Sequence, residues 1–300
     1  MKDTAPILLF VYKRLDTLRQ TVNSLQENSL AAESELFIFS DFGRSEAEKS
    51  LVEEVRVYLK TITGFRKVHI FESAINKGLA NSIISGVTRI INEYGRVIVL
   101  EDDLLLTPNF LSFMNTSLDK YENNREVYSI SGFMFDIRNK AGYPYDIFFT
   151  KRHCSWGWAM WKDRWNEIDW EVTDFSEFNQ SVSLKREFDS IGSDLSSSLA
   201  RQMAGKINSW AIRCNYHQFK KQTYTVYPLR SKVVNIGFGL DATHTRQRFN
   251  KYKATPDKDL KHEFILPDTI IEEKRLLKRF THKYSKITRI RYFILNKIFQ

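Results

Sequence analysis

The sequence predicts an α/β fold, with a mostly parallel central sheet flanked by helices and a helical extension at the C-terminus. Continuous apolar runs of strand length alternate with segments of helical spacing through the first half of the chain. This pattern is typical of strands buried on both faces and joined by right-handed crossovers. The composition, 42% hydrophobic and 27% charged, is that of an ordinary folded protein and excludes a largely disordered chain.

Each element of this half has its own signal. Residues 6–12 form an apolar strand, and apolar spacing from Leu15 to Leu25 predicts the following helix. Ser45 and Glu48 form a capping box that opens a helix through Leu59. The other predicted elements are strands at 36–40, 67–71, 96–100 and 128–131, a helix at 78–94, and a helix with Thr107 as N-cap and Pro108 as first residue.

Polar residues follow four of these strands, and ligands of such sheets bind beyond the carboxyl ends of the strands. They are Lys13 with Arg14, Asp41, Asn76 with Lys77, and the run Glu101–Asp103. A cation, an amide and an acidic cluster at one edge predict a site for a ligand with a phosphate, a polar ring and a metal. The chain has no glycine-rich dinucleotide loop or P-loop, so phosphate binding falls to the metal and to side chains.

The acidic cluster has two interpretations. Adjacent carboxylates at the end of a buried strand repel one another, and a hard divalent ion, Mg²⁺ or Mn²⁺, would relieve that repulsion. Alternatively, Asp102 and Asp103 are solvated loop residues that cap the next helix. The polar residues at the other three strand ends favour the metal.

Several segments resemble the GT-A fold of nucleotide-sugar-dependent glycosyltransferases, above all the N-acetylglucosaminyltransferase I type and its bacterial relatives in polysaccharide synthesis. The resemblance covers roughly residues 5 to 245. It is carried by the strand end at 13–14 and by the segments 40–43, 76–80, 99–103, 155–161, 206–211, 235–239 and 243–245.

The resemblance implies a role for each matching residue. Arg14 and Asp41 would hold the nucleotide, which the family suggests is UDP. Asn76 and Lys77 would lie beside the base and the diphosphate. The ribose would contact Asp102. Asp103 would be the main metal ligand, and the late His244 would be a second ligand to the metal or diphosphate.

The acceptor side is less defined. Five tryptophans lie between residues 156 and 170, and tryptophan faces stack on sugar rings. We expect Trp156 or Trp158 to line the acceptor cleft, because Gly157 between them allows close backbone approach, while at least two of the five belong to the core. The histidines at 153 and 217 have no role that the sequence suggests.

The resemblance implies an inverting transfer, which needs a carboxylate as base. The family places that carboxylate before a tryptophan, where this chain has Ser209 before Trp210. Serine alone cannot serve as a base at neutral pH. The other candidates are Asp241, which we favour because it shares a turn with His244, and Asp194, Asp163 and Asp136.

The formal charge of +9 is concentrated in a C-terminal tail. Nine Lys or Arg and no acidic residue lie between Lys274 and Gln300, whereas the first 273 residues carry 36 basic and 36 acidic side chains. Thr269 and Glu272 predict a helix from about Ile270. Its apolar stripe would be Leu276, Phe280, Tyr284, Ile287, Ile290, Ile294 and Ile298. This stripe fits an anionic membrane surface, bound through residues 270–300, or a helix folded back on the body.

We therefore expect a glycosyltransferase domain at 1–265, with a nucleotide-sugar and metal half at 1–134 and an acceptor half at 135–265, followed by a tail at 266–300. Two cysteines and no signal peptide favour a cytoplasmic location. If the tail binds membrane rather than packing on the body, the enzyme would be peripheral on the inner membrane face. Nucleic acid is not an expected partner, since the body is neutral. The alternatives are a non-catalytic carbohydrate-binding or scaffold protein on the same fold, and a sugar-phosphate nucleotidyltransferase.

Overall fold

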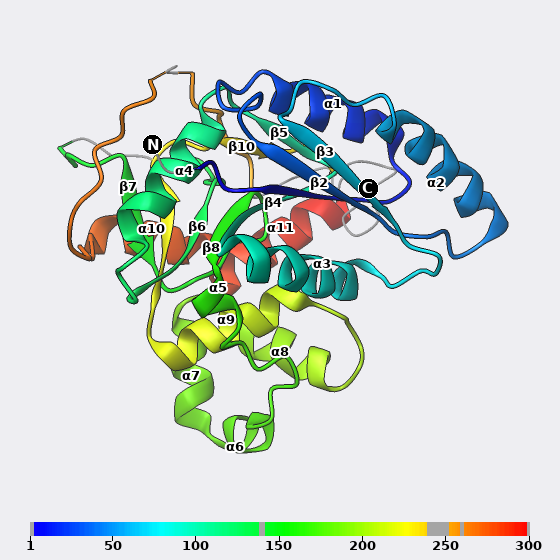
Figure 1. The fold of residues 1–300 in the computed structure, drawn as a ribbon. Helices are drawn as coiled ribbons and strands as arrows, with labels where there is room; N and C mark the ends of the chain where they lie inside the picture. The colour runs from blue at the N-terminus through cyan, green and yellow to red at the C-terminus, as the bar shows by residue number, and fades with distance from the viewer. Residues whose placement is uncertain (1–2, 138–141, 239–251, 259–260, 299–300) are drawn as a thin grey trace.

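A computed structural model of the chain describes residues 3–137, 142–238, 252–258 and 261–298. Its centre is an eight-stranded sheet of order β3-β2-β1-β4-β8-β6-β9-β7, and a small second sheet pairs β10 with β5 (Figure 1). The strands are β1 (Ile7–Val11), β2 (Glu35–Ser40), β3 (Lys67–Glu72), β4 (Arg96–Glu101), β5 (Leu104–Leu106), β6 (Val127–Ser131), β7 (Ile147–Thr150), β8 (Trp158–Trp161), β9 (Tyr224–Pro228) and β10 (Val233–Asn235).

Helices cover both faces of the large sheet, with α1 and α2 on one side of its first strands and α3 on the other (Figure 1). The helices are α1 (Leu15–Gln26), α2 (Glu46–Leu59), α3 (Leu79–Tyr94), α4 (Phe110–Tyr121), α5 (Lys162–Trp165), α6 (Phe175–Gln180), α7 (Val182–Ser190), α8 (Leu195–Met203), α9 (Trp210–Lys221), α10 (Lys274–Lys283) and α11 (Lys286–Ile298).

Alternate residues of one strand pack into two different cores, because successive side chains of a strand point to opposite faces. Ile7 and Leu9 of β1 belong to the larger core, which contains the buried residues of α1 and α4. Leu8 and Phe10 belong to a second core, which contains those of α3. This double burial explains why the strand lacks polar alternation and confirms the predicted layer arrangement.

The sheet is mostly parallel, as predicted, but its second half is mixed. The neighbours β3, β2, β1 and β4 pair in parallel, whereas β8 is antiparallel to both β4 and β6, and β7 is antiparallel to β9. The four parallel strands therefore bring their carboxyl ends to one edge, where the residues singled out in the sequence lie.

Two predicted helix starts were wrong. The helix expected at Pro108 begins at Phe110, because Thr107 bonds through its hydroxyl to Asn109 instead of capping a first turn. The tail helix begins at Lys274 rather than near Ile270, with Glu273 as its N-cap.

The predicted tail helix is divided into α10 and α11. Leu276, Phe280 and Tyr284 are buried in the larger core, where Phe280 stacks on Phe135. Five of the apolar residues of α11 are instead exposed, while Tyr292 and Leu295 are half-buried. None of the helices among the described residues combines the length and apolarity needed to cross a bilayer.

His153, which lies in the interior, gives the fold a dependence on pH. Its ring packs against Trp158 and Trp210, and burial lowers the pKa of His153 to about 3. An unfolded chain binds a proton at this histidine below pH 6.5, whereas the folded chain does not until about pH 3, so acid favours unfolding in this window.

We therefore predict that His153→Gln flattens the decline in stability between pH 6.5 and pH 5. Denaturant unfolding at several pH values should show a wild-type slope steeper by about 1.4 kcal/mol per pH unit, the value for one proton. Equal slopes for the two proteins would contradict the assignment, whatever the variant's stability at neutral pH.

Candidate functional site

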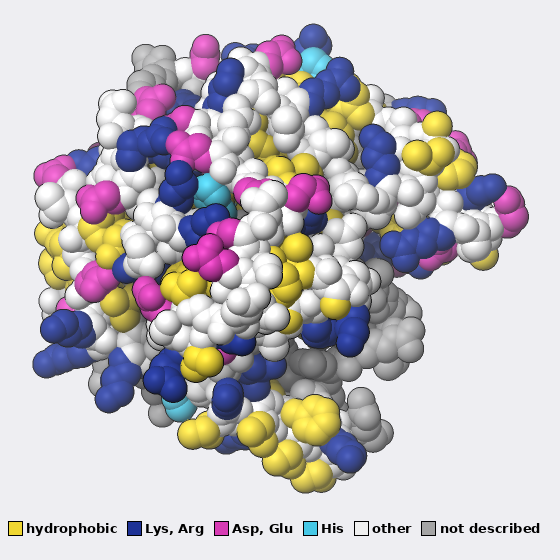
Figure 2. Space-filling model, turned by 90° about the horizontal axis from the view of Figure 1, so that it is seen from below, with side chains coloured by type: hydrophobic (Ala, Val, Ile, Leu, Met, Phe, Trp, Pro, Cys, Tyr) yellow, Lys and Arg dark blue, Asp and Glu magenta, His cyan; other side chains and the backbone are white. Residues whose placement is uncertain are grey.

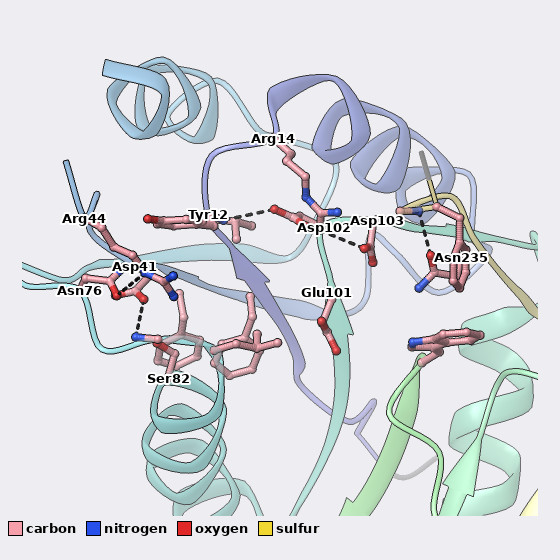
Figure 3. Close-up of a pocket in the computed structure, with 18 residues that line it drawn as sticks. Tyr12, Arg14, Asp41, Arg44, Asn76, Ser82, Glu101, Asp102, Asp103 and Asn235 are labelled. Carbon is pink, nitrogen blue, oxygen red and sulfur yellow. Dashed lines mark hydrogen bonds and ion pairs between the residues drawn. The ribbon is translucent and has the colours of Figure 1, made fainter. Parts of the chain in front are cut away.

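A pocket opens at the carboxyl ends of β1, β2 and β4 (Figure 3). Asp41, Arg44, Asn76 and Ser82 lie at one end of it, and Arg14, Asp102, Asp103 and Asn235 at the other. The described residues that line it are Phe10, Val11, Tyr12, Arg14, Phe39, Asp41, Arg44, Asn76, Gly78, Leu79, Ser82, Glu101, Asp102, Asp103, Trp156, Asn235, Gly237 and Phe238.

Asp41 organises the loop that leads into α3. Its Oδ1 accepts from the backbone N–H of Lys77 and its Oδ2 from that of Gly78, both at 2.9 Å. Gly78 has φ +73, in the left-handed region, and precedes the first residue of α3. The Asp41 carboxylate is therefore engaged with backbone, and it fixes the turn between Asn76 and the start of α3.

A second network supports the same end of the pocket. Glu48 accepts hydrogen bonds from the Tyr12 hydroxyl at 2.8 Å, Lys13 Nζ at 2.6 Å and the Arg44 N–H at 3.0 Å. The Lys13 and Tyr12 hydrogen bonds lower the pKa of Glu48 to about 2. Ser45 caps α2 as predicted, but the Glu48 carboxylate joins α2 to the end of β1 instead of closing the capping box.

Arg14 is the cation that contacts the acidic cluster. Its guanidinium donates to Asp102 and, at 2.9 Å, to Asp103, while the Tyr12 N–H donates to the second oxygen of Asp102 at 3.2 Å (Figure 3). Glu101 extends from the strand end away from Arg14, as the alternation of a strand requires. One cation therefore serves two carboxylates directly and leaves the third without a hydrogen bond among the described residues.

The cluster is short of positive charge. Burial, with repulsion from Asp103 and Asp102, raises the pKa of Glu101 to about 8. Burial also raises the pKa of Asp102 to about 6, although Arg14 opposes this shift. Asp103 Oδ1 is buried and accepts no hydrogen bond from the described residues. The described residues therefore supply less positive charge than the three carboxylates would carry when ionised.

The segment after β10 closes the acidic end. β10 pairs with β5, so Asn235 lies opposite Leu104, and the Ile236 N–H donates to the Asp103 carbonyl at 2.8 Å. Gly237 has no side chain for a physical reason: a Cβ there would lie 2.1 Å from Asp103 Oδ2. A glycine is required for the backbone to approach the carboxylate this closely.

The five tryptophans divide between the pocket and the core. Trp156 lines the pocket, with its ring edge-on to Phe238 at 5.5 Å. Trp158 is 1% exposed and stacks on Trp165 beneath the sheet, so the structure does not bring it to the pocket. Gly157 separates the two with φ +61.

The candidate bases have other partners or cannot be placed. Asp194 pairs with Arg152 at 2.8 Å, Asp163 with Arg164 at 2.8 Å, and Asp136 accepts from Thr255. None of the three lines the pocket, and Asp241 lies outside the described residues, as does His244. Ser209 is the N-cap of α9 and accepts from the Ile212 N–H, which gives this serine a structural role.

The pocket includes residues that sequence reasoning missed, namely Tyr12, Arg44, Ser82 and Asn235. Arg44 Nε donates to Asn76 Oδ1 at 3.2 Å, which joins the loops after β2 and β3. Arg44 comes three residues after Asp41, so a search that extended further beyond the end of each predicted strand would have included it. Lys77 was predicted here, but its contact with the site is through its backbone.

Asp103 is the carboxylate of this cluster that could hold a divalent cation. Its Oδ1 accepts no hydrogen bond from the described residues, and water and phosphate oxygens complete the shell of Mg²⁺ or Mn²⁺ when few carboxylates are available. Within the described part of the chain, no set of three or more His, Cys, Asp or Glu side chains converges as a metal site. The described residues therefore do not form a closed protein cage for a metal ion.

Comparison with known proteins finds only weak structural likenesses. No protein-family model and no curated protein sequence matches the chain. The mannosyltransferase PcManGT of Pyrobaculum calidifontis, in complex with GDP-Man and Mn²⁺, is 14% identical with a TM-score of 0.35, and the match covers 54% of this chain and 48% of the mannosyltransferase chain. S. aureus TarS 1–349, in complex with UDP, is 12% identical with a TM-score of 0.31, and the match covers 48% of this chain and 39% of the TarS chain.

The galactosyltransferase LgtC, in complex with donor and acceptor sugar analogues, is 12% identical with a TM-score of 0.39, covering 74% of this chain and 72% of its own. The chain thus spans less than half the length of the first two proteins. Likenesses of this strength do not assign an activity to the chain.

The close approach at Gly237 predicts that Gly237→Ala damages the acidic end of the pocket. The added Cβ must displace Asp103 or the β10 segment, at a cost of about 1–3 kcal/mol, the usual range for overpacking. Gly205→Ala is the control, because its Cβ meets nothing within 4 Å and only its φ of +67 is strained. We expect both variants to melt earlier, but only Gly237→Ala to weaken Mn²⁺ binding in a calorimetric titration with a nucleoside diphosphate present; unchanged Mn²⁺ binding under these conditions would contradict this account.

Proposed function

We propose that the protein is a metal-dependent glycosyltransferase that uses a nucleotide-diphosphate sugar as its donor. The observation that carries this proposal is the arrangement of a single pocket. One end presents amide, guanidinium and hydroxyl groups beside aromatic rings, and the other presents carboxylates short of a cation. A nucleoside joined to a diphosphate and a sugar has matching parts in the same order.

The nucleoside would occupy the end at Asn76. Phe39 lines this end and stacks on Phe10 with their ring centroids 5.0 Å apart, which provides an apolar wall for a base. Asn76, Arg44 and Ser82 supply donors and acceptors for the base edge and the ribose. UDP is the nucleotide that the family resemblance favours.

The diphosphate would occupy the end at Arg14 and Asp103. Arg14 supplies a fixed positive charge, and Asp103 would hold a divalent ion through Oδ1. When bound, such an ion would neutralise charge on the departing diphosphate. Arg14, held by both aspartates, orients the cluster before any ligand arrives, and the Gly237 backbone keeps side-chain bulk out of the space beside it.

The acceptor would enter beside Trp156, whose ring can stack on a sugar. We propose a saccharide or lipid-linked acceptor in cell-surface polysaccharide synthesis, and an inverting transfer. Because the aspartates at 136, 163 and 194 face other partners, Asp241 is the base that we propose, and His244 the second metal ligand, both on the grounds of sequence.

This proposal predicts that UDP with Mn²⁺ raises the melting temperature of the wild-type protein and that Asp103→Asn abolishes the shift. The substitution keeps the side chain's shape but removes the charge that binds the ion. Glu93→Gln is the matched control, because Glu93 is an exposed acid at the end of α3 away from the pocket, and it should leave the shift intact. Differential scanning fluorimetry measures both.

If no common nucleotide, with Mg²⁺ or with Mn²⁺, shifts the melting temperature of the wild-type protein, donor binding is refuted. A shift that persists in Asp103→Asn would refute the metal assignment alone. Hydrolysis of a panel of nucleotide sugars then distinguishes an enzyme from a non-catalytic sugar-binding protein, since only an enzyme releases nucleoside diphosphate above the rate of the Asp103→Asn variant.

A further inference from the structure

The last helix, α11, has its polarity reversed. Thr288 and Asn296 are buried, whereas five large hydrophobic residues are exposed. They are Ile287 at 74%, Ile290 at 57%, Phe293 at 68%, Ile294 at 46% and Ile298 at 66% exposed. A surface helix of a globular protein normally buries its apolar stripe. We call these five residues the outer apolar row.

Most members of the row repeat at steps of three and four, so they form one stripe along the helix. Figure 2 shows hydrophobic side chains gathered at the lower edge of the view, with Lys and Arg side chains beside them. A contiguous exposed apolar patch of this kind is typical of a surface that binds another protein, a membrane or a ligand.

The row is surrounded by positive charge. Residues 274–298 contain nine Lys or Arg and no Asp or Glu. Lys286, Arg291 and Lys297 belong to α11 itself and are exposed. A hollow next to α10 is lined by five further basic groups, Arg275, Lys278, Arg279, His282 and Lys283, together with Asp136 and Ile137.

The orientation of the row is imposed by the body. Arg152 lies over the Tyr284 ring at 3.7 Å, immediately before α11, and Arg289 Nη1 donates to the Ser193 carbonyl at 2.8 Å. The Ser193 hydroxyl donates in turn to the Tyr284 carbonyl at 2.8 Å. These contacts attach the inner face of α11 to the α7–α8 connection and leave the outer row exposed.

We propose that the outer apolar row and its basic surround are a docking surface for an anionic lipid membrane. Apolar side chains would enter the boundary between headgroups and acyl chains, and the flanking cations would contact anionic headgroups, as in interfacial amphipathic helices. Charge favours this occupant over a second copy of the chain, because two such surfaces face to face would bring their basic surrounds together and oppose like charges around the apolar contact. The inference is independent of the proposed activity.

Sedimentation with vesicles tests this surface. The full chain should bind vesicles of phosphatidylcholine with phosphatidylglycerol, and bind pure phosphatidylcholine vesicles far more weakly. Raising the salt from about 0.1 M to about 1 M should release it, since the screening length falls from about 10 Å to about 3 Å. Lys286→Gln with Lys297→Gln should lower the partition coefficient by roughly fivefold per charge removed.

Ile290→Glu with Phe293→Glu should abolish vesicle binding, whereas Leu51→Glu with Val57→Glu should not. The control pair is also exposed and apolar but lies on α2, and it adds the same negative charge. Unchanged melting temperatures would establish that all variants are folded. Three results would overturn the proposal: no vesicle binding by the wild type, equal binding by both double variants, or a concentration-dependent dimer that only the α11 pair disrupts.

Discussion

The organisation of the site depends on the pairing of Arg14 with the carboxylates at the end of β4. A parallel sheet buries the ends of its central strands, and here the chain places Glu101, Asp102 and Asp103 at such an end. Without Arg14, these groups would have to take up protons or leave the interior. Arg14 neutralises part of the charge, and Asp103 Oδ1 is buried without a hydrogen bond from the described residues. The proposal that the pocket binds a ligand together with a cation rests on this charge deficit.

The loops around the pocket are built so that little in it needs to rearrange. Asp41 fixes the start of α3, Glu48 ties α2 to the end of β1, and the β10 segment packs its backbone against Asp103. Each contact joins segments distant in the sequence. Preorganisation of this kind lowers the entropic cost of binding a flexible ligand, such as the proposed nucleotide sugar.

The sequence was sufficient to predict the parallel half of the sheet, because strands buried on both faces are continuous apolar runs with polar residues at their ends. It was also sufficient to predict that Arg14, Asp41, Asn76 and the acidic cluster lie at one edge of the sheet, because the carboxyl ends of parallel strands meet there. It could not predict the pairing of β10 with β5, which depends on tertiary contacts. Nor could it tell which of Trp156 and Trp158 lines the pocket, because the two residues lie on either side of Gly157 in the same short segment. Ser209 occupies the position of the expected catalytic carboxylate, but its role in the structure is to cap α9. The predicted tail helix is divided into α10 and α11 where its apolar stripe changes from buried to exposed.

The central claim is that the pocket holds a nucleoside diphosphate and a divalent ion together, with the ion on Asp103. Titration of Mn²⁺ followed by electron paramagnetic resonance tests this most directly, because the free ion has a strong signal that binding suppresses. The account predicts that protein alone removes little of the signal, whereas protein with UDP or another nucleoside diphosphate removes far more than the nucleotide does by itself. Additive losses, equal to the sum from the protein and the nucleotide measured separately, would contradict it.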